Sequence, residues 1–275
     1  FDTICMSLGA AGTGGFACRN SGQADYTLYQ QAVLSIAMIL FGVNFNVYYL
    51  LLIKKPKDAF RCEEMRGYLA VILGAVILIT LNVRHLFPSL FLAVHHVLFQ
   101  VASIITTTGY ATVDFNQWPE FSKCIVLLLM FIGACAGSTG GGIKVSRVLI
   151  LLKSVKKELK QYLHPSVVEK IKMDGKIVEH EVVRSTNVFM VAYVLIFAVS
   201  VLLISLDEYD LVTNFTAVTA TFNNIGPGLA LVGPTGNFGF FSNFSKLVLI
   251  FDMLAGRLEI FPLLLLFSRE TWKRF

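Results

Sequence analysis

Apolar runs long enough to cross a lipid bilayer dominate this sequence. A membrane-spanning helix needs about 20 predominantly apolar residues. Of the 275 residues, 55% are hydrophobic and only 15% are charged, and the mean hydropathy is +0.68. This composition predicts an all-α integral membrane protein rather than a water-soluble globule. The expected spans are Leu28–Ile53, Tyr68–Val83, Ser122–Leu152, Val188–Leu206 and Phe244–Phe267.

Three semi-apolar segments are too short to cross the membrane, so we expect re-entrant half-helices there. They are Phe1–Leu8, Pro88–Ile104 and Leu211–Thr221, and the loops after them read "GAAGTGGFA", "ITTTGYATVDF" and "TFNNIGPGLA". Aligned on one glycine of each loop, the chain repeats a unit of span, half-helix, loop and span. The unit is whole in 68–152 and 188–267 and lacks its leading span in 1–53. We therefore expect a pseudo-fourfold ring whose first unit, with the first span of the second, is missing from this chain.

The basic residues predict the topology, because Lys and Arg collect in short cytoplasmic loops. Segment 54–66 carries five of them, 144–184 carries ten and 269–274 carries three, out of 23 in the chain. The three half-helix loops then face outward, where several acidic residues lie. An acidic outer mouth favours cations.

Glycines in the half-helix loops suggest an ion filter. A half-helix that enters from outside directs its partially negative C-terminal end toward the membrane centre, where it attracts a cation. The following residues can offer backbone carbonyls to the ion if a glycine allows the backbone to turn. Gly15, Gly109 and Gly226 occupy that position. The alternative for any single loop is an ordinary turn glycine, and the three aligned copies favour the filter.

The segment "FIGACAGSTGGGIKVSR" (131–147) breaks the expected span 122–152 with five glycines. Glycine unwinds a helix easily, and Ser138 and Thr139 can bond the freed backbone groups. A movable intramembrane loop is expected at 133–144. Lys144 either belongs to this loop or reaches toward the cytoplasm. Arg257 lies in mid-span, where we expect it to face the pore and bond the loop's carbonyls or repel cations, with a salt bridge to Glu259 as the alternative.

Four motifs, "TTTGY", "NNIGPG", "GACAGSTGGGIK" and "GRLEIFPLL", resemble those of TrkH/TrkG-type bacterial potassium uptake proteins, in the superfamily that includes KtrB and fungal and plant relatives. The resemblance implies uptake of potassium, with sodium as a second candidate ion, across the bacterial inner membrane by a multi-pass protein. It implies that ions contact backbone carbonyls of Thr13, Gly14, Thr107, Thr108, Asn224 and Ile225. It further implies a gate made of the intramembrane loop, with Gly137, Ser138, Thr139, Gly140, Gly141, Gly142 and Lys144, together with Arg257. The same resemblance implies a homodimer and a separate cytoplasmic subunit that binds nucleotide, with K⁺ as the transported ion and no covalent cofactor.

The expected organisation follows from these units. Residues 1–53 belong to the second unit, 54–66 to a cytoplasmic loop, 67–152 to the third unit and 186–275 to the fourth. The basic stretch 153–185 is expected to form a helix and then a hairpin, because Asp174-Gly175 lies between two alternating runs. A solvated loop is the alternative. In the family resembled, this face contacts the regulatory subunit.

Other functions find less support. "GSTGGGIK" lacks the spacing and the preceding strand of a phosphate-binding loop, and the five cysteines and His95–His96 form no metal-ligand pattern. The positive charge is explained by topology, so no nucleic-acid partner is expected, and no arrangement of nucleophile and base suggests an enzyme. A cation-coupled secondary transporter, moving potassium with protons or sodium, remains the alternative. Asp252 and Glu259 are the acidic residues in the expected spans that could serve it.

Overall fold

The computed structural model describes residues 1–18, 22–164, 170–258 and 260–273, and its regular structure is almost entirely helical. The α-helices are α1 (Asp2–Gly12), α2 (Leu28–Phe41), α3 (Phe45–Leu52), α4 (Pro56–Arg61), α5 (Glu63–Val83), α6 (Leu90–Ile105), α7 (Glu120–Phe131), α8 (Val145–Leu163), α9 (His180–Ile204), α10 (Leu211–Phe222), α11 (Asn243–Leu258), α12 (Ile260–Leu266) and α13 (Arg269–Trp272). Short 3₁₀ turns lie at Arg84–Leu86, Phe115–Gln117, Ser205–Asp207 and Ala230–Val232. The strands are β1 (Lys172–Met173) and β2 (Lys176–Ile177).

Two continuous helical stretches of the described chain are long and apolar enough to cross a membrane, Glu63–Leu86 and His180–Asp207. They contain the expected spans 68–83 and 188–206. The other expected spans are interrupted. A loop separates α7 from α8, and α11 and α12 take the place of the last span, with residue 259 between them outside the described residues.

The expected span Leu28–Ile53 is bent rather than straight, because α2 and α3 meet at an angle of 89°. A side chain at Gly42 would place its Cβ 2.3 Å from the hydroxyl oxygen of Tyr68, so only glycine fits at the bend. Asn44 then starts α3, since its Oδ1 accepts a hydrogen bond from the backbone N–H of Asn46 at 2.9 Å. Hydropathy alone does not reveal such a bend, because both helices are apolar.

The short helices α1, α6 and α10 coincide with the three segments too short to cross the membrane. Side chains cap two of them: Ser89 accepts from Leu92 N–H at 3.2 Å before α6, and Asp210 accepts from Thr213 N–H at 3.0 Å before α10. The C-terminal halves of α6 and α10 are buried almost completely. Their ends therefore lie within protein, where irregular backbone is tolerated at membrane depth.

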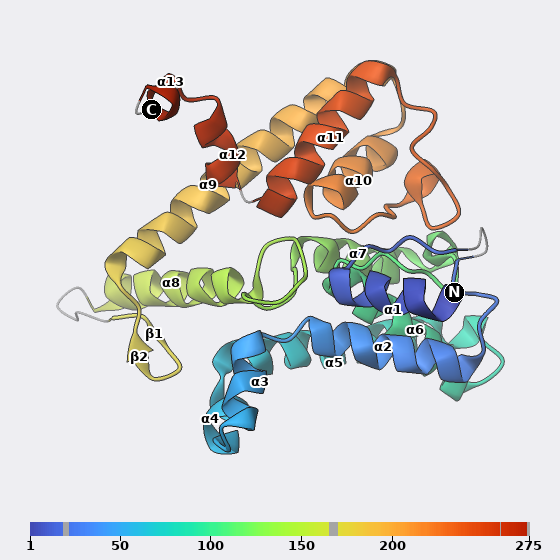
Figure 1. The fold of residues 1–275 in the computed structure, drawn as a ribbon, viewed down its shortest axis with the longest axis horizontal. Coiled ribbons are helices and arrows are strands. Elements are labelled where there is room, and N and C mark those ends of the chain that lie inside the picture. Colours follow the sequence, from blue (N-terminus) through green and yellow to red (C-terminus); the bar gives the residue numbers. More distant parts are fainter. Residues whose placement is uncertain (19–21, 165–169, 259, 274–275) are drawn as a thin grey trace.

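The segment from α7 through its loop to α8 runs through the middle of the molecule in Figure 1, with α1–α6 on one side and α9–α12 on the other. One apolar core joins α5, α6 and α7, and a second joins α9, α10 and α11. The guanidinium of Arg147 in α8 lies 4.0 Å from the centre of the Phe189 ring in α9, which links the two halves.

Strands β1 and β2 form an antiparallel hairpin at the place where the sequence predicts one. Its turn residues Asp174 and Gly175 both have positive φ, 51° and 77°, as a type I′ turn requires. The hairpin follows the basic helix α8, whose C-terminal half is exposed.

Candidate ion-binding loops and intramembrane loop

The loops after α1, α6 and α10 share one backbone geometry. The first residue of each loop, Thr13, Thr107 or Asn224, has a left-handed conformation with φ of 53°, 58° and 57°. The backbone N–H of the next residue donates to the carbonyl oxygen of the residue five positions earlier. The donor–acceptor distances are 2.8, 2.9 and 2.8 Å for Gly14, Thr108 and Ile225. Gly15, Gly109 and Gly226 follow with φ of 72°, 86° and 109°. All nine residues predicted as a filter therefore lie in three copies of one helix-ending motif.

These loops also touch one another. A Cβ on Gly15 would lie 1.8 Å from the carbonyl oxygen of Thr108, and a Cβ on Gly109 would lie 1.9 Å from that of Ile225. Only glycine allows such an approach, and its positive φ independently disfavours other residues. Segments about a hundred residues apart in sequence are thus brought together at their carbonyls.

The loop between α7 and α8 closes on itself at its base. Ile132 and Ile143 form a parallel bridge, with Gly133 N–H donating to Ile143 O at 2.7 Å and Ile143 N–H to Phe131 O at 3.2 Å. Within the loop, the Ser138 hydroxyl donates to Cys135 O at 2.6 Å, and the Lys144 ammonium donates to Gly140 O. Lys144 therefore bonds its own loop, the first of the two orientations expected from the sequence.

The glycines of this loop lie directly against the helix ends that precede the candidate ion-binding loops, residues 13–15, 107–109 and 224–226. Gly141 N–H donates to the Thr107 hydroxyl at 2.6 Å. A Cβ on Gly141 would lie 2.7 Å from Asn223 O, and a Cβ on Gly140 would lie 3.1 Å from Thr106 O. Close packing therefore requires glycine at both positions, since larger residues would push the loop away.

Arg257 contacts a different partner from the one expected. Its guanidinium donates to the Thr13 hydroxyl at 3.1 Å and to Gly12 O at 3.2 Å, at the end of α1, and not to the carbonyls of the intramembrane loop. The link to that loop is indirect, because Oγ1 of Thr13 also lies 3.2 Å from Thr139 O. The alternative pairing with Glu259 falls on a residue outside the described part of the chain.

The predicted gate residues line one cavity of about 400 Å³. Gly137, Ser138, Thr139, Gly140, Gly141, Gly142, Lys144 and Arg257 all line it, together with side chains of α8–α12. A larger cavity of about 1180 Å³ is lined by Thr13–Gly15, Gly109, Asn224–Gly226 and, again, Arg257. Arg257 is thus shared between the cavity at the intramembrane loop and the cavity at the ion-binding loops.

Polar side chains that the sequence did not single out also shape this region. Tyr193 donates its hydroxyl to Asn223 Oδ1 at 2.9 Å, behind the third ion-binding loop. Glu64 accepts three hydrogen bonds near the intramembrane loop. The sequence held one signal for Glu64: it is an acidic residue within a basic segment, at the start of an apolar run. Among the described residues, no group of His, Cys, Asp and Glu could hold a metal ion.

A family model described as TrkH, a cation transport protein, matches residues 1–274. The chain belongs to the TrkH family. It is 36% identical over 278 residues to the Trk system potassium uptake protein TrkH of Salmonella typhimurium and 33% identical over 276 residues to TrkG of Escherichia coli. Each alignment covers 99% of this chain, and 57% and 56% of the relatives. This TrkH-family chain is therefore a membrane protein of a cation transport family, not of an enzyme family.

The fold of this TrkH-family chain matches that of the crystal structure of the potassium transporter TrkH from Vibrio parahaemolyticus. The TM-score is 0.91 at 34% sequence identity, covering 98% of this chain and 59% of that one. The chain spans somewhat over half the length of the relatives it matches.

Proposed function

We propose that the protein takes up potassium, with sodium as a second candidate ion, across the bacterial inner membrane through a filter of backbone carbonyls. The carbonyls of Thr13, Gly14, Thr107, Thr108, Asn224 and Ile225 are the ion ligands in this proposal. The single observation that carries it is the common backbone geometry of three loops that follow helix ends, with the first loop in contact with the second and the second with the third. Helix C-termini carry partial negative charge, and carbonyl rings replace the hydration shell of a cation.

In the same proposal, three span–half-helix–span units, the first incomplete, surround the ion path with α1, α6 and α10 as the half-helices. The related proteins named as potassium transporters support the choice of ion.

The intramembrane loop 133–144 and Arg257 form the gate in this proposal. The loop contacts Thr107 and closely approaches Thr106 and Asn223, directly below the ion-binding loops. Arg257 places a positive charge beside Thr13, where a cation leaving the filter would meet it. Removal of either obstacle should therefore increase passive ion flow.

The basic face of α8 and the hairpin β1–β2 are the proposed contact surface for a regulatory subunit that binds nucleotide. The relatives are named as members of a "Trk system", which supports a multi-component assembly. A homodimer is proposed as the assembly of the membrane subunit.

A coupled transporter is the second candidate, and one buried carboxyl group favours it. Asp252 in α11 has no exposed surface, and its Oδ1 accepts from the Ser200 hydroxyl at 2.6 Å. Its Oδ2 has no hydrogen-bond partner among the described residues. A buried acidic group of this kind is a proton-binding candidate in a membrane protein. Collapse of the proton gradient, or Asp252→Asn, would stop uptake under this candidate but not in a passive pore.

The deciding experiment measures rubidium uptake into liposomes that hold the full-length protein. Arg257→Ala and deletion of Gly137–Gly142 should each raise passive uptake severalfold without any proton or sodium gradient. Gly74→Ala in α5 is a suitable control, because a Cβ there meets no atom within 4 Å. Uptake that depends on a gradient and is unchanged by both gate variants would contradict the pore and favour the coupled transporter.

A further inference from the structure

The carboxylate of Glu64 is buried at the start of α5, with 4% of the residue exposed, and accepts three hydrogen bonds. Oε1 accepts from the backbone N–H of Ala136 at 2.6 Å and of Ser146 at 3.1 Å. Oε2 accepts from the side-chain amide of Asn44 at 3.1 Å. Bonds from N–H groups to a carboxylate are among the stronger ones in proteins.

The three donors belong to three different segments. Ala136 lies in the intramembrane loop, Ser146 lies in the first turn of α8 just after that loop, and Asn44 starts α3 at the bend. The bend and the loop are also bonded directly, because Cys135 N–H donates to Gly42 O at 3.0 Å and Phe45 N–H to Gly137 O at 3.2 Å. Glu64 therefore bonds the loop, the helix after it and the bend together.

We propose that Glu64 is a positioning residue that holds the intramembrane loop against the ion-binding loops. This inference rests on the proposed function, in which that loop obstructs the ion path. The physical reason is that loss of the carboxylate leaves the buried N–H groups of Ala136 and Ser146 without their acceptor, and water can satisfy them only if the loop moves outward.

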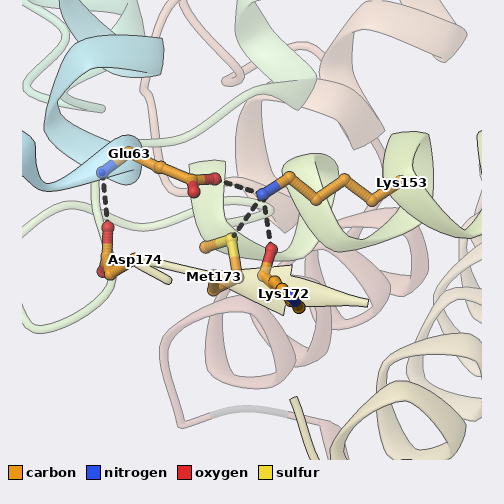
Figure 2. Close-up of polar contacts among 5 residues, drawn as sticks. All are labelled: Glu63, Lys153, Lys172, Met173 and Asp174. Carbon is orange, nitrogen blue, oxygen red and sulfur yellow. Dashed lines mark hydrogen bonds and ion pairs between the residues drawn. The ribbon is translucent and has the colours of Figure 1, made fainter. Parts of the chain in front are cut away.

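Glu63, the residue before Glu64, attaches the same turn of α5 to the hairpin and to α8. Figure 2 shows Glu63 between α8 and the hairpin: its backbone N–H donates to Asp174 Oδ1 at 2.6 Å, and its Oε2 pairs with Lys153. The Lys153 ammonium also donates to Lys172 O at 2.6 Å. Glu64 is thus held on a turn that the hairpin and α8 keep in place, as a positioning residue requires.

Cys135 provides a direct measure of loop position, because it lies inside the loop and is completely buried. In the full-length protein with Cys135 as the sole cysteine, a membrane-impermeant methanethiosulfonate reagent added from the cytoplasmic side should label it slowly. Glu64→Gln keeps an oxygen for Ala136 and Ser146, but it loses the bond from Asn44 and the charge that strengthens the other two bonds. It should therefore accelerate labelling about tenfold, the factor that corresponds to about one hydrogen bond. Rubidium uptake should rise in parallel. Glu181→Gln, an exposed glutamate in the first turn of α9, is the matched control and should change neither rate.

A second variant guards against a merely misfolded protein. In Glu64→Gln the new side-chain NH2 group faces the NH2 group of Asn44, so two donors lie together. Asn44 Oδ1 cannot replace the lost acceptor, because it already accepts from the backbone N–H of Asn46. Asn44→Asp in the same chain turns that clash into a hydrogen bond, while the Gln oxygen still accepts from Ala136 and Ser146. The double variant should therefore restore slow labelling, although Asn44→Asp alone should accelerate it by placing two carboxylates together.

Unchanged Cys135 labelling in Glu64→Gln, or failure of Asn44→Asp to restore it, would overturn the inference. The proposed gate fails separately: faster labelling without faster rubidium uptake would support Glu64 as the positioning residue and show that the loop is not the barrier.

Discussion

At the scale of single residues, Gly109 is a position where substitution should be harmful for two independent reasons. Gly109→Ala places a Cβ 1.9 Å from Ile225 O and forces alanine into a backbone with φ of 86°, which alone costs on the order of 1–3 kcal/mol. Two ion-binding loops would be displaced together, so rubidium uptake should fall at least about tenfold. Uptake in liposomes checks this, with Gly74→Ala as the control. Normal uptake by Gly109→Ala would exclude this loop from the ion path.

The three loops that contain the predicted filter residues could be located from sequence because their signal is local. A helix end, a residue able to adopt the left-handed conformation and a glycine two positions later recur in three segments. The partners of Arg257 could not be predicted, since Gly12 and Thr13 lie more than 240 residues away along the chain. Glu64 was overlooked for the same reason: its donors come from residues 20, 72 and 82 positions away.

At the scale of elements, Asp210 stabilises the start of α10 in its ionised form. Hydrogen bonds from the side chain and then the backbone N–H of Thr213 lower the pKa of Asp210 below its ordinary value of 3.8. Because the pKa of Asp210 is lower in the folded than in the unfolded state, its ionised form stabilises the folded protein at pH values above the unfolded-state pKa. This contribution is lost as the pH falls through the folded-state pKa. Protein stability should therefore decrease below about pH 4.

Asp210→Asn provides the measurement, because asparagine also caps helices but carries no charge. The melting temperature of the variant should fall less than that of the wild type between pH 6 and pH 3. Equal decreases in both proteins would show that Asp210 does not contribute to this pH dependence.

The helices themselves were predictable in position but not in continuity. The period and length of apolar runs locate α5, α9 and the three short helices, because burial in lipid or protein demands those residues. The bend at Gly42–Asn44 depends on Tyr68, a residue from another helix that leaves no space for a side chain. Such a contact between elements has no counterpart in a local sequence pattern.

At the scale of the whole molecule, bound ions should stabilise the fold. Thr13, Thr107 and Asn224 all hold an unfavourable left-handed backbone, which a cation bound to their carbonyls would compensate. A ligand at a hundred times its dissociation constant adds about 2.7 kcal/mol to stability. The melting temperature should thus be higher in potassium than in choline at equal ionic strength. Identical melting temperatures in potassium, sodium and choline would contradict ion binding at these carbonyls.

The contacts between the ion-binding loops have an order. Gly15 lies close against the carbonyl oxygen of Thr108, and Gly109 lies close against that of Ile225. A Cβ on Gly226, in contrast, would have no atom nearer than 4.0 Å. A disturbance in the first loop thus reaches the second, and one in the second reaches the third. Because neighbouring sites share these contacts, the free-energy costs of changes in adjacent loops will not add, and the row of loops behaves as one thermodynamically coupled unit.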